Sequence, residues 1–231
     1  MGLNRRDFMK AGALATAGFL TAGLPDLAEA ASPDIAHGSR STPQVALTFH
    51  GAGDVTIANK LISIFTATKT PVTVFAVGTW LKADPSIAKT LLDGGHDLGN
   101  HTYSHTQMKT ISAKMVDSEI ALCAAELTKL IGNHGKFFRP SGTQYSTALI
   151  RKTALKYGYK KCISYDVDSH DYQDPGKAAV VKNVMTNVKN GSIISLHFGH
   201  QDTIDALPTV IEQLHAKGLT PVTLSTMVGT I

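Results

Sequence analysis

The chain has 231 residues, of which 43% are hydrophobic and 17% charged, and 22 Lys and Arg against 18 Asp and Glu give it a formal net charge of +4. This composition excludes a disordered tail protein, a collagen-like fibre and a multi-span membrane protein, and the length suits one domain. The basic residues are scattered rather than clustered, which argues against a nucleic-acid partner and is compatible with a polyanionic setting such as a cell surface.

Residues 1–30 have the pattern of a secretory signal peptide. Arg5 and Arg6 precede an uncharged run from Ala11 to Leu24, and an Ala-x-Ala motif at 28–30 marks a cleavage site. The run is too short and too rich in Ala and Gly to span a bilayer, which takes about 20 apolar residues. An amphipathic helix is the alternative, but the apolar positions do not share one face.

The paired arginines resemble those of twin-arginine signals, which export folded proteins. We therefore expect an exported protein, located in the periplasm, the cell envelope or the extracellular space, with no stable membrane anchor after cleavage. Residues 31–43 are polar, contain two prolines and are expected to form a linker. Residues 44–231 are expected to form the functional domain.

From Gln44 onward, short apolar runs rich in β-branched and aromatic residues alternate with helical patterns. The runs are continuous rather than alternating, as in strands that are covered on both faces. The predicted strands are Val45–His50, Val72–Val77, Asp97–Gly99, Lys136–Arg139, Lys161–Asp166, Ile193–His197 and Thr220–Leu224.

Capping residues predict where several of the intervening helices begin and end. The longest predicted helix begins at Ser112 and ends at Gly132. The other predicted starts are Asp84-Pro85, Asp174-Pro175, and Asp202 or Thr203, with ends at Gly94-Gly95, Asn190-Gly191 and Gly218. Strands that alternate with helices predict an α/β domain of parallel strands, which can be a closed or incomplete barrel or an open doubly wound sheet.

Polar side chains with catalytic potential follow the carboxyl ends of the predicted strands. This edge is where ligands bind in both barrels and open sheets. The residues are His50, Asp54, His101, His105, Arg139, Asp166, Asp168, Asp171 and His197.

His101 and His105 are four residues apart and, if helical, share a face that can bind one metal ion. The spacing alone is weak evidence, but the pair directly follows a strand and lies near a candidate third ligand. Two histidines and a carboxylate leave a fourth zinc position open for water, which is the arrangement of a hydrolytic site.

His197 ends an apolar strand and is either a core histidine or a catalytic one. A carboxylate from Asp168 would orient its ring and hold it protonated as a general acid. Arg139 follows two aromatic residues, and its planar guanidinium suits orienting a carboxylate or binding an anion. The alternative for the aspartates, and for Asp171 in part, is a role in turns and helix caps.

Taken in chain order, these residues resemble the five motifs of the polysaccharide deacetylases, the NodB homology domain family. The resemblance extends from about Val45 to Leu224 and implies a distorted or incomplete (β/α) barrel of about seven parallel strands in a single domain. The motifs are Thr48-Phe49-His50-Gly51-Ala52-Gly53-Asp54 in place of Thr-Phe-Asp-Asp-Gly, His101-Thr102-Tyr103-Ser104-His105, Phe138-Arg139-Pro140-Ser141-Gly142, Asp168-Ser169-His170-Asp171-Tyr172 with Tyr in place of Trp, and Leu196-His197.

The resemblance implies metal-dependent removal of acetyl groups, from nitrogen or oxygen, on an acetylated polysaccharide or cell-wall glycan. The cofactor would be a divalent metal ion, with zinc as the default. His197 would protonate the leaving group and Leu196 would line the pocket for the acetate methyl group. Arg139 would orient the catalytic base, Asp168 would tune His197, and Tyr172 would form part of the groove wall.

The first motif departs from the family pattern, because His50 and Gly51 replace two aspartates that act as base and metal ligand. One hypothesis is that Asp54 folds back across a glycine turn as the third ligand, beside His101 and His105, with His50 as the base. The reverse assignment, His50 as ligand and Asp54 as base, remains open because an imidazole can do either. A second function class is a non-catalytic carbohydrate-binding relative that has lost the base.

Overall fold

The structure, a computed structural model, describes residues 34–229 of the chain. The expected signal peptide at residues 1–30 lies outside this range. Among the described residues, no helix combines the length and the hydropathy needed to cross a bilayer.

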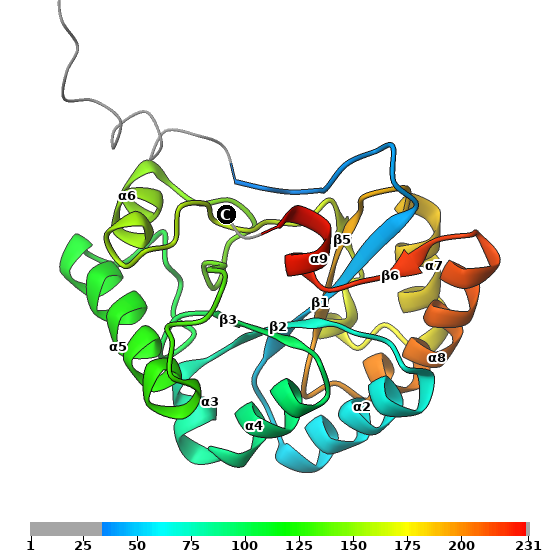
Figure 1. Cartoon of the computed structure of the whole chain (residues 1–231), viewed down its shortest axis with the longest axis horizontal. Coiled ribbons are helices and arrows are strands. Elements are labelled where there is room, and N and C mark those ends of the chain that lie inside the picture. The colour runs from blue at the N-terminus through cyan, green and yellow to red at the C-terminus, as the bar shows by residue number, and fades with distance from the viewer. Residues whose placement is uncertain (1–33, 230–231) are drawn as a thin grey trace, which may run out of the picture.

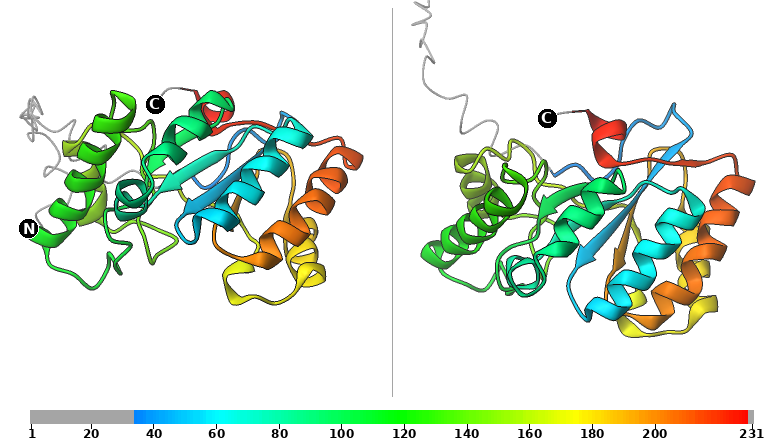
Figure 2. Two further views of the ribbon diagram at one scale, coloured as in Figure 1. Left: turned by 90° about the horizontal axis from the view of Figure 1, so that it is seen from below. Right: turned by 60° about the horizontal axis from the view of Figure 1, so that its bottom comes forward.

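The strands form one parallel sheet with β1 at its centre, in the order β3-β2-β1-β5-β4, and β6 pairs with the amino end of β1 (Figure 1). Crossover helices separate the strands along the chain, and Figure 2 shows that they lie around the outside of the sheet. The strands are β1 Gln44–Gly51, β2 Thr73–Ala76, β3 Asp97–Asn100, β4 Val167–Asp168, β5 Ile193–His197 and β6 Thr220–Pro221. The helices are α2 Val55–Thr68, α3 Gly78–Ala83, α4 Ser86–Asp93, α5 Ala113–Ile131, α6 Ala148–Lys156, η1 Asp171–Gln173, α7 Lys177–Asn187, α8 Gln201–Ala216 and α9 Leu224–Val228.

The two faces of β1 point into two different parts of the core. Val45, Leu47 and Phe49 are fully buried in the cluster that packs the sheet against the helices. Ala46 belongs to a second cluster inside the curved sheet, which also contains Leu224 from the start of α9. Because side chains alternate along a strand, His50 shares the inner face with Ala46 and is delivered to the carboxyl end of the barrel interior.

Beyond β3 the sheet continues only as isolated bridges. The barrel is therefore distorted and incomplete. Phe138 bridges both Asn100 and Cys162, and Ile163 bridges Ile35. The two strands predicted at Lys136–Arg139 and Lys161–Asp166 are thus present only as these single bridges. Pro140 has no amide hydrogen with which to continue the ladder from Phe138, and the Arg139 guanidinium instead donates to the carbonyls of Ile163 and Ser164.

Several predicted boundaries are confirmed and others shift by one to three residues. Ser112 caps α5 by accepting from the Met115 amide, and Gly132 ends that helix with φ 77°. Asp84 is instead the C-cap that follows α3, and α4 begins at Ser86 with Pro85 at its N-cap position. The other shifted starts are Lys177 for α7 and Gln201 for α8.

The described part of the expected linker, residues 34–43, lies against the domain rather than apart from it. The Ile35 amide donates to the Cys162 carbonyl at 2.9 Å. Arg40 donates to Asp166 at 2.7 Å, and Asp166 in turn accepts from the Ile193 amide at 2.8 Å. Through Asp166 this segment is linked to the amino end of β5, and Asp166 has a structural partner rather than a place in the cleft.

Candidate active site

A cleft of about 410 Å³ opens at the carboxyl ends of the strands. His50 from β1 and His197 from β5 are directly paired across neighbouring strands, so their rings lie 4.3 Å apart. None of the residues that line this cleft carries a carboxylate: they are His50, His105, Gln107, Pro140, Gly142, Thr143, Gln144, Tyr165, Tyr172 and His197.

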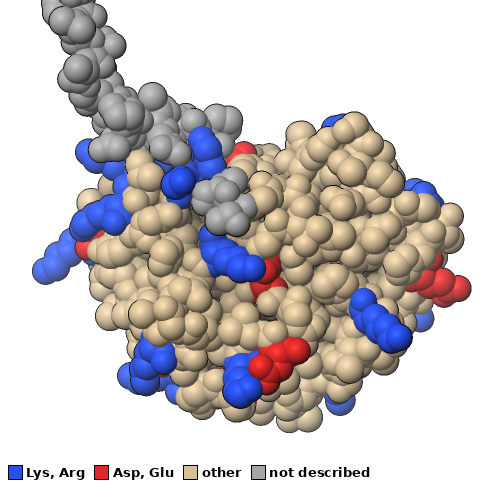
Figure 3. All heavy atoms as spheres, viewed as in Figure 1, with Lys and Arg blue, Asp and Glu red and all other residues tan. Residues whose placement is uncertain are grey.

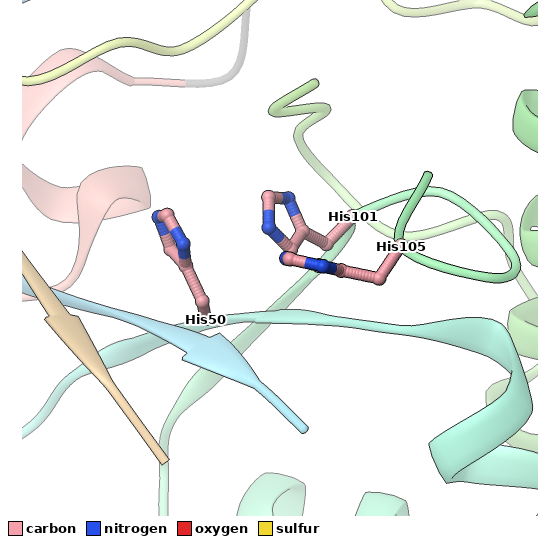
Figure 4. A group of neighbouring side chains, drawn as sticks. All are labelled: His50, His101 and His105. Atoms are coloured by element: carbon pink, nitrogen blue, oxygen red, sulfur yellow. The ribbon is translucent and has the colours of Figure 1, made fainter. Parts of the chain in front are cut away.

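Three histidines converge beside this cleft, as Figure 4 shows. One ring nitrogen from each of His50, His101 and His105 lies within 4.8 Å of the others. The His101 Nδ1 is 2.8 Å from the Arg139 carbonyl, which only accepts, so Nδ1 carries the proton and Nε2 carries the lone pair. That Nε2 is buried and has no hydrogen-bond partner among the described residues. A buried, unpartnered lone pair beside two more imidazoles is a donor set suited to a divalent cation.

The His101–His105 segment is a loop, and the expectation of a shared helical face is wrong. Thr102 and His105 have φ 69° and 57°, a left-handed conformation that is strained for a β-branched residue such as Thr102. Glu119 on α5 holds the loop, because its carboxylate accepts from the Tyr103 and Ser104 amides at 2.9 and 2.8 Å. The loop turns the two rings to within 5.0 Å of each other, which the residue spacing alone did not require.

Asp54 is not brought to the histidines. It is the N-cap of α2, and its Oδ1 accepts from the Thr56 and Ile57 amides at 2.8 and 3.3 Å. The hydrogen bond from the Thr56 amide, together with that from Ile57, lowers the pKa of the Asp54 carboxyl. Its side chain is exposed and stands outside the metal-ligand group, in which His50 takes the third position. The glycine turn before Asp54 directs it to the helix rather than to the metal-binding residues.

Replacing Asp54 with alanine is expected to lower the melting temperature by roughly 2–4 °C, because α2 loses its N-cap. Bound metal is expected to remain unchanged. Differential scanning calorimetry and metal analysis of the purified protein measure the two quantities. Asp54→Asn is the control, since asparagine caps helices as well as aspartate does. Loss of metal in the alanine variant would restore Asp54 as a ligand.

Arg139 is buried, with 1% exposure, and its guanidinium contacts His50, which lines the cleft. Its Nη1 donates to Thr48 Oγ1 at 2.9 Å and lies 3.2 Å from His50 Nε2, and its guanidinium stacks 4.2 Å from the Phe75 ring centre. Burial lowers the pKa of Arg139 to about 9, although its charge is retained at neutral pH. Arg139 therefore contacts the residue at the position of the family's base, as expected, but that residue is an imidazole.

His197 is oriented by Asp171 and not by Asp168. The Asp171 carboxylate is buried and lies 2.7 Å from His197 Nδ1, and it also accepts from the His197 amide at 2.8 Å and from Thr203 Oγ1 at 2.6 Å. Burial acts to raise the pKa of Asp171, but the hydrogen bonds and charge of His197 outweigh it and lower that pKa. Since Nδ1–H donates to a carboxylate, Nε2 of His197 is the nitrogen available to the cleft.

Asp168 contacts the backbone of its own loop and also the side chain of Tyr165, which lines the cleft. Its Oδ1 accepts from the His170 amide at 2.9 Å, the geometry of an Asx turn. The capping role that the sequence left open for the aspartates therefore belongs to Asp168, and the orienting role belongs to Asp171. Asp171 is the first residue of the 3-10 helix η1, which places its carboxylate against His197 at the end of β5, and no capping or periodicity pattern predicts this turn.

The two expected substrate-binding residues differ in position. Tyr172 lines the cleft, is 44% exposed, and its ring lies 5.1 Å from that of His197. Leu196 has 1% exposure and packs in the cluster between sheet and helices, on the opposite face of β5 from His197. It therefore does not line the cleft, because adjacent residues of a strand point to opposite faces.

Burial lowers the pKa values of His50 and His101 well below their ordinary 6.5, and neighbouring charges add to this effect. The unfolded chain takes up protons below pH 6.5 that the folded protein does not, so the stability of the metal-free protein is expected to fall as pH decreases through this range. The slope is expected to reach about 1.4 kcal/mol per pH unit for each histidine.

Urea unfolding of chelator-treated protein between about pH 7.5 and about pH 5 measures this slope. The His101→Gln variant is expected to show a shallower slope because one buried titrating group is removed. Equal slopes in the two proteins would contradict the assignment.

Comparison with known proteins shows which family and which solved structures the chain is similar to. The family described as polysaccharide deacetylase matches residues 37–162. A peptidoglycan-N-acetylglucosamine deacetylase from Bacillus cereus is 30% identical over 185 residues, covering 78% of this chain and 86% of the relative.

Two solved structures share the fold. A peptidoglycan N-acetylglucosamine deacetylase in complex with 4-naphthalen-1-yl-N-oxidanyl-benzamide is 30% identical with a TM-score of 0.76, covering 84% of this chain and 91% of the other. A mutant of a CE4 family pseudoenzyme from Bacillus anthracis, with restored enzymatic activity, is 25% identical with a TM-score of 0.78, covering 84% of this chain and 70% of the other.

Proposed function

Since this chain belongs to the polysaccharide deacetylase family, we propose that it is an exported, metal-dependent hydrolase that removes acetyl groups from a cell-wall glycan. The observation that carries the proposal is the convergence of three imidazoles beside the cleft, next to His197, whose ring is oriented by a buried carboxylate. A purely structural histidine cluster would have no use for the unpartnered Nε2 of His101.

His50, His101 and His105 would hold the cation, and a neutral set of imidazoles favours zinc among the common divalent ions. When bound, such a cation polarises a carbonyl group and lowers the pKa of water. The Arg139 carbonyl fixes the ligating tautomer of His101. Glu119 supports the same ligand set by holding the loop that carries His101 and His105.

The remaining cleft residues fit a neutral sugar. Tyr172 presents an exposed ring on which a sugar face can stack, and the Gln107 and Gln144 amides suit hydroxyl and acetamido groups. Figure 3 shows one face of the molecule, on which Lys and Arg gather at the upper left and are otherwise separated by neutral surface and a few acidic side chains. The curated relatives named above act on N-acetylglucosamine in peptidoglycan, and we propose this class of substrate here.

Export is proposed from the sequence of residues 1–30. Replacing both Arg5 and Arg6 with lysine is expected to keep the protein inside the cell if the twin-arginine route is used. Fractionation of cells that express each form measures this, and unchanged export would refute that route.

The function is tested by acetate release from acetylated peptidoglycan and from chitin oligosaccharides. Purified protein loaded with zinc is expected to release acetate, and a chelator is expected to abolish the release until zinc is restored. Absence of release from either glycan by protein with bound zinc would refute the enzymatic proposal.

The second candidate is a non-catalytic glycan-binding relative. It is favoured by the lack of a carboxylate among the residues that line the cleft, since the first motif has lost both aspartates. This candidate predicts glycan binding by calorimetry without acetate release, and the His50→Asp variant would be expected to gain activity by regaining the carboxylate beside Arg139.

A further inference from the structure

The cleft raises the question of which group accepts the proton of the attacking water. Among the described residues, no carboxylate lines the cleft. Asp54 caps α2, and Asp168 contacts the His170 amide and the Tyr165 side chain; neither carboxylate belongs to the three-histidine group or lines the cleft. His50 stands at the position of the family's base, but it belongs to the proposed ligand set.

His50 is unsuited to proton transfer for a second reason. Its Nε2 lies 3.2 Å from Arg139 Nη1, a group that only donates, and 3.5 Å from Ser195 Oγ. In the neutral ring Nε2 then carries the lone pair and Nδ1 the proton, so His50 has a single lone pair, which either the Arg139 donor or a bound cation would occupy. A proton that arrived at His50 would lie next to the buried charge of Arg139.

His197 has the contacts that His50 lacks. Its Nδ1–H is held at 2.7 Å by Asp171, a buried carboxylate fixed by two further donors. Its Nε2 therefore carries a lone pair and faces the cleft, and positive charge gained there is balanced by the carboxylate behind it. The side chain is 18% exposed and its ring lies 4.3 Å from that of His50, next to the three-histidine group.

We infer that His197 performs both proton transfers of the reaction, as base for the attacking water and then as acid for the leaving group. This inference rests on the deacetylase function proposed above. The water oxygen bonds to the acetyl carbon, one water proton moves to His197 Nε2, and the carbonyl electron pair moves onto its oxygen. That pair then re-forms the carbonyl, the bond from carbon to the leaving nitrogen breaks, and the proton on Nε2 moves to this nitrogen. The products are acetic acid and a free amine, and His197 returns to its starting state.

The alternative is that His197 acts only as the acid. The rate of hydrolysis of an aryl acetate by a His197 variant distinguishes the two cases. The aryl oxygen of 4-nitrophenyl acetate departs without protonation, so its hydrolysis needs a base and no acid. If His197 supplies both, the His197→Ala variant is expected to lose activity by about 10²–10⁴-fold on the aryl acetate as well as on the glycan amide. The quantity compared is kcat/KM of the chelator-sensitive rate.

His200→Ala is the matched control, because His200 is the neighbouring imidazole, 6.1 Å from His197, and does not line the cleft. It is expected to retain both activities. Melting temperature and bound zinc establish that the His197 variant is folded, and His197→Gln serves if the alanine variant is not.

A His197 variant that keeps aryl acetate hydrolysis while losing the amide reaction would overturn the inference alone and leave the deacetylase function intact. Wild-type protein that hydrolyses neither substrate would overturn the proposed function and this inference with it.

Discussion

Replacing His101 with alanine is expected to remove bound zinc and to reduce acetate release by about a thousandfold or more. His101 is fully buried, and its Nε2 is the lone pair in the cluster that has no other partner. Its tautomer is fixed by the Arg139 carbonyl, so the nitrogen is prepared for ligation before any ion arrives. A bound cation contributes several kcal/mol to stabilising charge in the transition state, and about 4 kcal/mol corresponds to the stated factor.

Metal analysis after dialysis and titration with zinc measure the first effect, and acetate release measures the second. His215→Ala is the control, because this histidine is exposed in the last turn of α8, and the variant is expected to keep zinc and activity. A His101→Ala protein that folds, keeps zinc and releases acetate at the wild-type rate would show that the three-histidine group is not the metal site.

The elements that the sequence predicted best are those fixed by local chemistry. Strand β5 has its predicted bounds of Ile193 to His197, because a continuous apolar run and a following glycine define it. Helix α5 begins after Ser112 and ends at Gly132, because both caps are local hydrogen-bond patterns. The prediction that His50 and His197 lie at the cleft is confirmed, because the end of a strand in a parallel sheet determines where its last side chain lies. His105 also lines the cleft, but the loop that Glu119 holds places it there.

The misassigned residues are those whose place depends on contacts far apart in the chain. Asp171 reaches His197 because η1 folds back under β5, and Thr203 completes the contact from α8. Asp54 has two possible uses, and α2 takes it as a cap because the Thr56 and Ile57 amides are two and three residues away. Leu196 was assigned to the cleft from its motif, although strand alternation beside His197 already places it on the opposite face.

Replacing Asp171 with asparagine is expected to reduce acetate release by on the order of a hundred- to a thousandfold, because the oriented form of His197 is lost. The carboxylate accepts from three donors, whereas the amide of asparagine has one acceptor oxygen and a nitrogen that donates. When the amide nitrogen of asparagine faces His197, the imidazole can accept from it only in the other tautomer, with its proton on Nε2.

Asp168→Asn is the matched control and is expected to lose far less activity, because Asp168 accepts from its own turn. A purely structural role for Asp171 would lower the melting temperature without changing His197. Nitrogen-15 NMR of the imidazole therefore decides the matter, because in wild-type protein the proton is expected on Nδ1 and in Asp171→Asn it is expected to move toward Nε2. The opposite result would be an unchanged His197 tautomer and rate in Asp171→Asn, with both changed in Asp168→Asn. In that case Asp168 orients His197, and the contact of 2.7 Å between Asp171 and His197 Nδ1 does not contribute to catalysis.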